Sequence, residues 1–200
     1  MITPGQDWGE PASGPPDLVV EGTDADLAAA VRAQPGALVR FVPTDDSDVA
    51  RSIGLTRTSP GAWIVPMDAL RVDGSFALNM LVVGARPNAL HRFSPRQATR
   101  VAVDGRQVFD GPATTVLVAT GQFLEGLDVV PRGHPGDGRA EVQVYALRPG
   151  ERRAMRARLR TGTHLPHPHI TQATGRRIEV GVPNRRVVVE VVPNAYRLLV

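Results

Sequence analysis

Two Asp-Gly dipeptides flanked by apolar runs constrain the fold of this chain more than any other feature. The first lies between residues 69–72 and 76–83, and the second lies between residues 98–103 and 106–109. Aspartate followed by glycine is typical of the type I′ turn, because both central residues of that turn need positive φ. The sequence therefore predicts two β-hairpins, one around Asp73-Gly74 and one around Asp104-Gly105.

Short β-rich runs continue to the end of the chain, separated by glycine and proline. They cover residues 114–119, 127–130, 140–147, 177–182, 186–192 and 196–200. Many short strands at this spacing are typical of an antiparallel sandwich or barrel. One helix, over residues 149–160, interrupts them. We expect residues 61–200 to form a β-sandwich domain.

The first sixty residues follow a different pattern. Residues 1–16 are rich in proline and glycine and poor in apolar residues, so we expect a disordered tail. Residues 17–60 alternate between strands, at 18–20 and 37–42, and helices, at 24–34 and just before Gly54. Strands joined in this way lie parallel. The predicted fold class is α+β, with a small α/β unit packed on a larger antiparallel β-sandwich.

The basic residues and the missing cysteines exclude several kinds of site. The chain has no cysteine, and all 23 of its Lys-plus-Arg residues are arginine. This composition excludes thiolate catalysis, disulfides, cysteine-ligated zinc, a Schiff-base lysine and the phosphate-binding lysine of a P-loop.

The overall charge does not indicate a nucleic-acid-binding protein. The pI is near 10.4, but the net charge at pH 7 is only +3. Arginine stays protonated to high pH, so even a small excess of arginine over acids gives a high pI. Nine residues are Phe, Trp or Tyr, which leaves few surfaces on which bases could stack. We therefore expect no nucleic-acid partner. The sequence has neither a spanning apolar stretch nor a secretion signal, so we expect a cytoplasmic protein.

The stretch from Ala113 to Phe123, followed by Pro131 and by residues 135–138 (Pro-Gly-Asp-Gly), resembles the C-terminal domain of the bacterial diacylglycerol kinase family. That family includes sphingosine-kinase-like lipid kinases. The hairpin at residues 101–112 and the segment at residues 162–168 are similar to the family's flanking elements. The resemblance runs in order over about residues 17–200. It implies that residues 17–60 are the remnant of a nucleotide-binding domain, whose first strands and helices have no counterpart in this sequence.

The resemblance also implies where nucleotide loops would lie. Gly22, Thr23 and Asp24 stand at the family's Gly-Gly-Asp-Gly-Thr loop, and Thr44, Asp45, Asp46 and Ser47 stand at its second glycine-rich loop. Glu21 replaces one glycine of the first loop, and the second loop has lost both of its glycines. Phosphate-binding loops need glycines and no adjacent negative charge. ATP and Mg²⁺ are therefore expected only if the chain still acts as a kinase, and residues 44–48 are more simply interpreted as a helix N-cap.

The catalytic centre of the resembled family is also altered. The family's Asp-Gly-Glu general base has no counterpart in the turn at residues 181–186, and Thr120 replaces an asparagine, so no catalytic residue is assigned. Asp137 stands where the family places an acid near its metal network. It is a candidate metal ligand, although Asp-Gly is also a common turn.

We expect a degenerate relative of the lipid kinases, a pseudoenzyme that binds a lipid or a protein partner. Two alternatives stay open. One is an active ATP-dependent lipid kinase completed by a second chain. The other is a structural or regulatory homodimer that pairs through the strand near residues 18–20.

Arginines dominate residues 148–160, which hold six arginines and one acid. On a helix, Met155 and Leu159 would dock on the sandwich. The arginines predicted to face outward are Arg152, Arg153, Arg156 and Arg160. This face indicates either a solvated basic surface or contact with the anionic headgroups of a membrane to which the protein binds peripherally.

Three histidines follow the arginine-rich segment. His164, His167 and His169 form a His-x-x-His-x-His pattern, which has two interpretations. They are either part of a loop between helix and sheet, or ligands of a metal that needs a further group from elsewhere.

Overall fold

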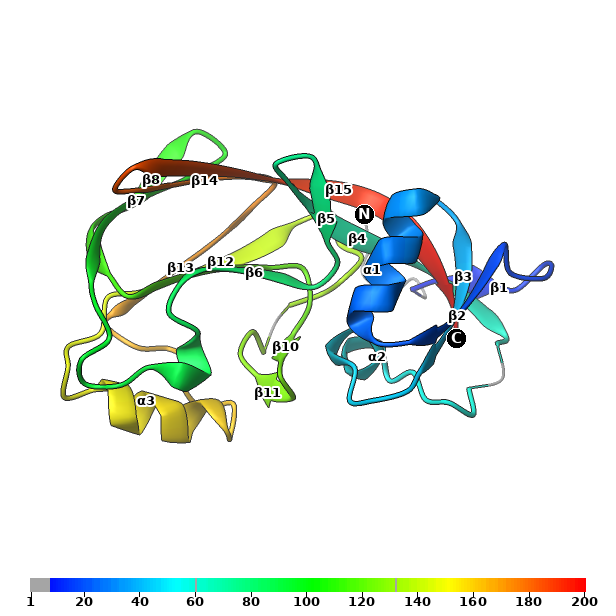
Figure 1. Cartoon of the computed structure of the whole chain (residues 1–200), viewed down its shortest axis with the longest axis horizontal. Helices are drawn as coiled ribbons and strands as arrows, with labels where there is room; N and C mark the ends of the chain where they lie inside the picture. The colour runs from blue at the N-terminus through cyan, green and yellow to red at the C-terminus, as the bar shows by residue number, and fades with distance from the viewer. Residues whose placement is uncertain (1–7, 60, 132) are drawn as a thin grey trace.

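The computed structural model describes residues 8–59, 61–131 and 133–200 and has the predicted α+β architecture, with two sheets packed face to face. Figure 1 shows the large sheet running along the top of the molecule and the small sheet beneath part of it. The large sheet contains β1 (Glu10–Pro11), β2 (Leu18–Gly22), β3 (Leu38–Pro43), β4 (Trp63–Val72), β5 (Ser75–Ala77), β7 (Gln97–Val103), β8 (Arg106–Ala113), β14 (Arg177–Val182) and β15 (Arg185–Leu199).

The small sheet is antiparallel, and the helices lie outside the two sheets. Its strands are β13 (Ile170–Gly175), β12 (Ala140–Tyr145), β9 (Thr115–Ala119) and β6 (Met80–Gly84). A separate ribbon joins β10 (Phe123–Leu124) and β11 (Leu127–Asp128). The helices are α1 (Asp24–Ala33), α2 (Asp48–Ile53), α3 (Arg152–Leu159) and the short 3₁₀ turn η1 (Pro87–Ala89). In the described ranges no helix is both long and apolar enough to cross a bilayer.

Both predicted hairpins are confirmed. β4 pairs with β5 around Asp73-Gly74, and β7 pairs with β8 around Asp104-Gly105. The central residues have φ of 48° and 77° in the first turn, and 49° and 79° in the second. Positive φ at both positions defines the type I′ turn, which explains why aspartate and glycine are found there.

The front α/β unit is continuous with the large sheet. β2 and β3 pair in parallel, as predicted, and β3 also pairs in parallel with the end of β15. α1 packs on this part of the sheet through the buried side chains of Leu27 and Val31. β2 is the edge strand, and the side chain of Val19 on it is 67% exposed. This is the edge on which the predicted dimerisation depends.

Four predictions about individual segments are wrong. The run at residues 76–83 is not one strand, because β5 ends at Ala77 and β6, which begins at Met80, belongs to the small sheet. Residues 8–16 are not a disordered tail, because β1 pairs with β4 and the Trp8 ring packs in the core of the front unit; residues 1–7 lie outside the described residues. Strand β13 was not expected. The two strands predicted at 186–192 and 196–200 are one long strand, β15, with a bulge between Val192 and Tyr196.

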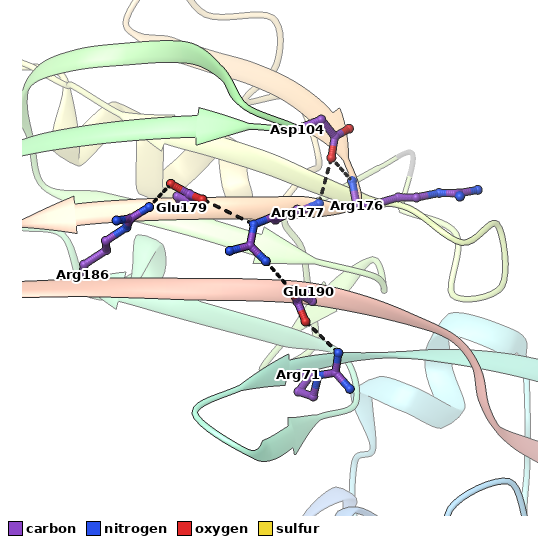
Figure 2. Close-up of polar contacts among 7 residues, drawn as sticks. All are labelled: Arg71, Asp104, Arg176, Arg177, Glu179, Arg186 and Glu190. Carbon is purple, nitrogen blue, oxygen red and sulfur yellow. Dashed lines mark hydrogen bonds and ion pairs between the residues drawn. The ribbon is translucent and has the colours of Figure 1, made fainter.

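The outer face of the large sheet carries a network of ion pairs (Figure 2). Glu190 lies between Arg177 on β14 and Arg71 on β4, and Glu179 pairs with Arg177 and Arg186. The neighbouring arginines lower the pKa of both glutamates, and the pairs are largely open to solvent. Exposed pairs of this kind add little stability each. Arg71, Arg177 and Arg186 are therefore each balanced by a glutamate, whereas among the described residues no ion pair involves an arginine of α3.

Candidate functional site at the junction of the front unit and the sandwich

The two loops predicted as nucleotide-loop remnants meet at the start of α2. The Asp24 carboxylate accepts hydrogen bonds from the N–H groups of Asp48, at 2.9 Å, and Val49, at 3.3 Å, and from the Ser47 hydroxyl. The Ser47 hydroxyl also caps α2 by accepting from the Ala50 N–H at 2.9 Å. Negative charge at this position suits the positive end of a helix. The predicted N-cap is therefore present, and a carboxylate from the other loop strengthens it.

Asp48, the first residue of α2, accepts backbone hydrogen bonds in the same way, but from the sandwich. The Asp48 carboxylate accepts from the N–H groups of Glu125, at 2.6 Å, and Gly126, at 2.8 Å, in the turn between β10 and β11. The Arg51 guanidinium lies 5.7 Å from the centre of the Phe123 ring on the same ribbon. These contacts fix α2 against the sandwich.

The other remnant residues have local structural roles. Thr23 is the N-cap of α1 and forms a capping box with Asp26, and the Gly22 carbonyl accepts from the Thr44 N–H at 2.9 Å. Asp45 and Asp46 are exposed, and Asp46 pairs with Arg51 at 3.5 Å. The junction therefore gathers several carboxylates, and the N–H donors at its centre already bind two of them.

A second acidic group at the junction, which the sequence analysis missed, is the buried Asp68 on β4. Its carboxylate accepts from the N–H groups of Gly138, at 2.6 Å, and Asn194, at 3.0 Å. Asn194 lies in the bulge of β15, where a backbone N–H has lost its partner strand. Burial raises the pKa of Asp68, with a smaller contribution from the negative charge of Asp137. Asp68 thus fixes both the bulge and the loop that carries Asp137.

Asp137 itself stabilises the turn in which it lies. Its side chain accepts from the Arg139 N–H at 2.9 Å, which is the usual arrangement of an aspartate in a turn. In the part of the chain that the structure describes, no group of three or more His, Asp or Glu side chains could hold a metal ion. The metal role of Asp137 stays a prediction.

The buried Tyr196 lies near both acidic groups. Its hydroxyl is fully enclosed and has no hydrogen-bond partner among the described residues. Burial raises the pKa of this phenol, and the negative charges of Asp24 and Asp68 raise it further. No motif marked Tyr196 or Asp68. The one available signal was an aspartate inside the otherwise apolar run at residues 63–70 of β4.

Comparison with known proteins gives a family. A family model described as the YegS C-terminal NAD kinase beta sandwich-like domain matches residues 72–197. The chain belongs to this family. No curated protein is similar enough to count as a match.

Solved structures agree with this assignment. The structure of a diacylglycerol kinase from Bacillus anthracis superposes with a TM-score of 0.74 at 15% identity, covering 92% of this chain and 77% of that one. A second structure from the same organism gives a TM-score of 0.76 at 13% identity, with coverage of 92% and 78%. At this identity the likeness shows the fold. The predicted kinship with diacylglycerol kinase-type lipid kinases is confirmed.

The YegS-type sandwich carries α3 on the outer side of its small sheet, and α3 differs from the prediction at Arg152. Met155 and Leu159 are buried as expected, and Arg153, Arg156 and Arg160 are exposed. Arg152 is only 2% exposed, because its guanidinium turns inward and donates to three backbone carbonyls. The prediction that Arg152 faces outward is therefore wrong.

The three histidines do not converge on one point. His164 is buried, and its Nε2 donates to the Val129 carbonyl at 2.9 Å. His169 Nδ1 bonds Glu151 at 2.9 Å, and the His167 and His169 rings lie 5.8 Å apart. They form a structured link between α3 and β13, which agrees with the loop interpretation.

Protonation of His164 should destabilise the protein in mild acid. Burial lowers the pKa of this imidazole, so the unfolded chain, with its ordinary pKa near 6.5, takes up a proton more readily than the folded one. We therefore expect the contribution of His164 to the free energy of unfolding to be constant above about pH 6.5 and to fall below it. Urea unfolding between pH 7.5 and 5.0 measures this slope. His164→Gln, whose amide can also donate to Val129, should flatten it, and an equally steep slope in this variant would contradict the assignment.

A pocket of about 560 Å³ lies away from the junction, over the outer face of the small sheet. Its floor consists of Glu141, Gln143, Gln172 and Thr174, and Leu165 is part of its wall. The Thr174 hydroxyl donates to Glu141 at 2.9 Å. None of the residues predicted as nucleotide, metal or lipid contacts lines it.

Proposed function

We propose that this member of the YegS-type family is a non-catalytic protein that binds anionic lipid surfaces through α3. The proposal has two parts, the loss of phosphoryl transfer at the junction and the retention of a basic surface. The observation that carries the lipid part is the unbalanced arginine face of α3.

The geometry of the junction supports the loss of catalysis. A loop binds phosphate with backbone N–H groups that point outward and have no other acceptor. Here the N–H groups at the start of α2 bind Asp24, and those of the β10–β11 turn bind Asp48. A triphosphate would have to displace both carboxylates and would meet the charges of Asp45 and Asp46 as well. Coulomb repulsion and competition for donors therefore both oppose ATP binding.

The expected result of a calorimetric titration with ATP and Mg²⁺ is no heat and no thermal stabilisation at several millimolar nucleotide. A ligand present at 100 times its dissociation constant stabilises a protein by roughly 2.7 kcal/mol, so binding near 50 μM would be evident as a shift in melting temperature. Binding in this range would instead favour the lipid kinase completed by a second chain, and a lipid phosphorylation assay would follow.

The arginine face of α3 supports binding to anionic lipids. Arg153, Arg156 and Arg160 are exposed, and no ion pair joins any of them to an acid within the described residues. The arginines in Figure 2 differ, because each of those that make ion pairs has a glutamate beside it. Basic side chains on an amphipathic helix are attracted by the negative potential of anionic bilayers. Each arginine near the surface contributes about 1 kcal/mol to the free energy of membrane binding.

The triple variant Arg153→Gln, Arg156→Gln, Arg160→Gln should lose most of its binding to anionic vesicles. Three arginines contribute roughly 3 kcal/mol, which corresponds to a decrease in affinity of about 100-fold at low salt. Sedimentation with vesicles of phosphatidylcholine and phosphatidylglycerol measures this change. The matched control removes three exposed arginines of the large sheet, Arg100, Arg106 and Arg185, and should bind like the parent protein. Equal losses in the two variants would mean that net charge, and not α3, determines binding.

A further inference from the structure

We propose that Phe93 is an apolar anchor that enters the membrane interface beside α3, on a turn held rigid by the buried Arg152. This inference rests on the proposed function, since it assigns the part of the lipid-binding surface that leaves the aqueous phase. The occupant is the interfacial layer of an anionic bilayer.

Phe93 is unusually exposed for an aromatic side chain. It is 82% open to solvent, and it lies at residues 91–94, between η1 and β7. Burying a phenylalanine side chain contributes about 1.5–3 kcal/mol, so this position forgoes most of the stabilisation that the ring could give to folding. Single exposed apolar residues are common on protein surfaces, so the exposure of Phe93 points to a partner only together with the arginines around it.

The backbone around Phe93 is fixed by local hydrogen bonds. The Ser94 N–H donates to the His91 carbonyl at 3.0 Å, and the His91 N–H donates to the Ser94 hydroxyl at 3.0 Å. The Phe93 N–H donates to His91 Nδ1 at 3.2 Å. The ring is therefore presented by an ordered turn, and little conformational entropy is lost when it is buried elsewhere.

Arg152 joins this turn to α3. Its Nη1 lies 3.1, 2.9 and 2.7 Å from the carbonyl oxygens of His91, Arg92 and Ser94. These are charge-assisted bonds to a group with almost no access to water, which makes them stronger than bonds between neutral partners. These three bonds, which we call the Arg152 clamp, hold the Phe93 turn next to the first turn of α3, in the region that Figure 1 shows beside the helix.

The charges around Phe93 suit an anionic partner. The Arg92 guanidinium lies 5.9 Å from the centre of the Phe93 ring. Burial lowers the pKa of Arg152, and the charge of Arg96 lowers it further. Glu151, the acid just before α3, has its carboxylate engaged by His169 and by the Arg148 N–H. An aromatic ring amid arginines is the composition of helices and loops that lie in the interface of anionic membranes.

The variant Phe93→Trp tests this placement directly. With vesicles of phosphatidylcholine and phosphatidylglycerol that carry brominated acyl chains, its added fluorescence should shift to the blue and be quenched. The parent protein gives the background from Trp8 and Trp63. Val19→Trp is the matched control, because Val19 is also an exposed apolar residue but lies on edge strand β2, and its fluorescence should not change.

A second measurement separates the anchor from the charge. Phe93→Ser should bind the same vesicles about tenfold more weakly, and this difference should persist at high salt, where the arginine contribution is screened. If the parent protein binds vesicles but Phe93→Trp is not quenched and Phe93→Ser binds equally well, the anchor is wrong and the arginine surface stands. If the parent protein does not bind vesicles, both proposals are wrong.

Discussion

Replacing Arg152 with methionine should lower the free energy of unfolding by about 2 kcal/mol. Methionine fills most of the volume of the arginine side chain but has no donor, so the carbonyls of Arg92 and Ser94 lose their hydrogen bonds to the guanidinium, whereas that of His91 keeps the Ser94 N–H. A buried acceptor without a partner costs about 1 kcal/mol or more. Urea unfolding followed by circular dichroism measures the change.

The neighbouring residue provides the control for Arg152. Arg153→Met removes the same charge from the next position of α3, where the side chain is exposed, and should change the stability by less than about 0.5 kcal/mol. A loss of equal size in both variants would mean that the destabilisation comes from helix propensity or net charge. The buried clamp would then contribute little.

Replacing Asp68 with alanine should also cost about 3 kcal/mol, because two buried N–H groups lose their acceptor. One of them, on Asn194, lies in the bulge of β15, and the other, on Gly138, lies in the loop from the sandwich. Neither donor has a strand partner to replace the carboxylate. Thermal and urea unfolding give the magnitude.

Asp137→Ala is the matched control for Asp68. It removes a carboxylate from the same loop, but among the described residues this carboxylate accepts only from the Arg139 N–H, in a turn that is partly open to water. We expect a loss of about 1 kcal/mol or less. If Asp68→Ala proved as mild as Asp137→Ala, water would be able to enter and satisfy the bulge.

The sequence predicted the local structure well wherever a short motif determines the backbone. Asp73-Gly74 and Asp104-Gly105 form type I′ turns because few other residue pairs tolerate positive φ twice. Met155 and Leu159 indicated the buried face of α3 because side chains four apart share a face of a helix. The motifs of the second half also indicated the bacterial diacylglycerol kinase family, and the match to the YegS-type family model confirms this kinship.

Segments whose structure depends on distant partners were predicted poorly. Strand β13 has a mixed polar sequence, and it forms because it completes the small sheet beside β12. Residues 8–16 have too few apolar groups to fold alone, yet β1 and Trp8 are held by β4 and the core of the front unit. In both cases the stabilising contacts come from residues far along the chain, and no local pattern records them.

Arg152 and Asp68 show most clearly which features follow from the sequence and which depend on the tertiary structure. The sequence by itself determined the hairpins, the parallel front strands, the helix on the sandwich and the acidic residues that replace the phosphate-loop glycines. Only the tertiary structure decided that Arg152 turns inward and that Asp68 joins a bulge to a loop. The physical reason is that a charged side chain is buried only where folded backbone offers it hydrogen-bond partners, and those partners are brought together by the fold.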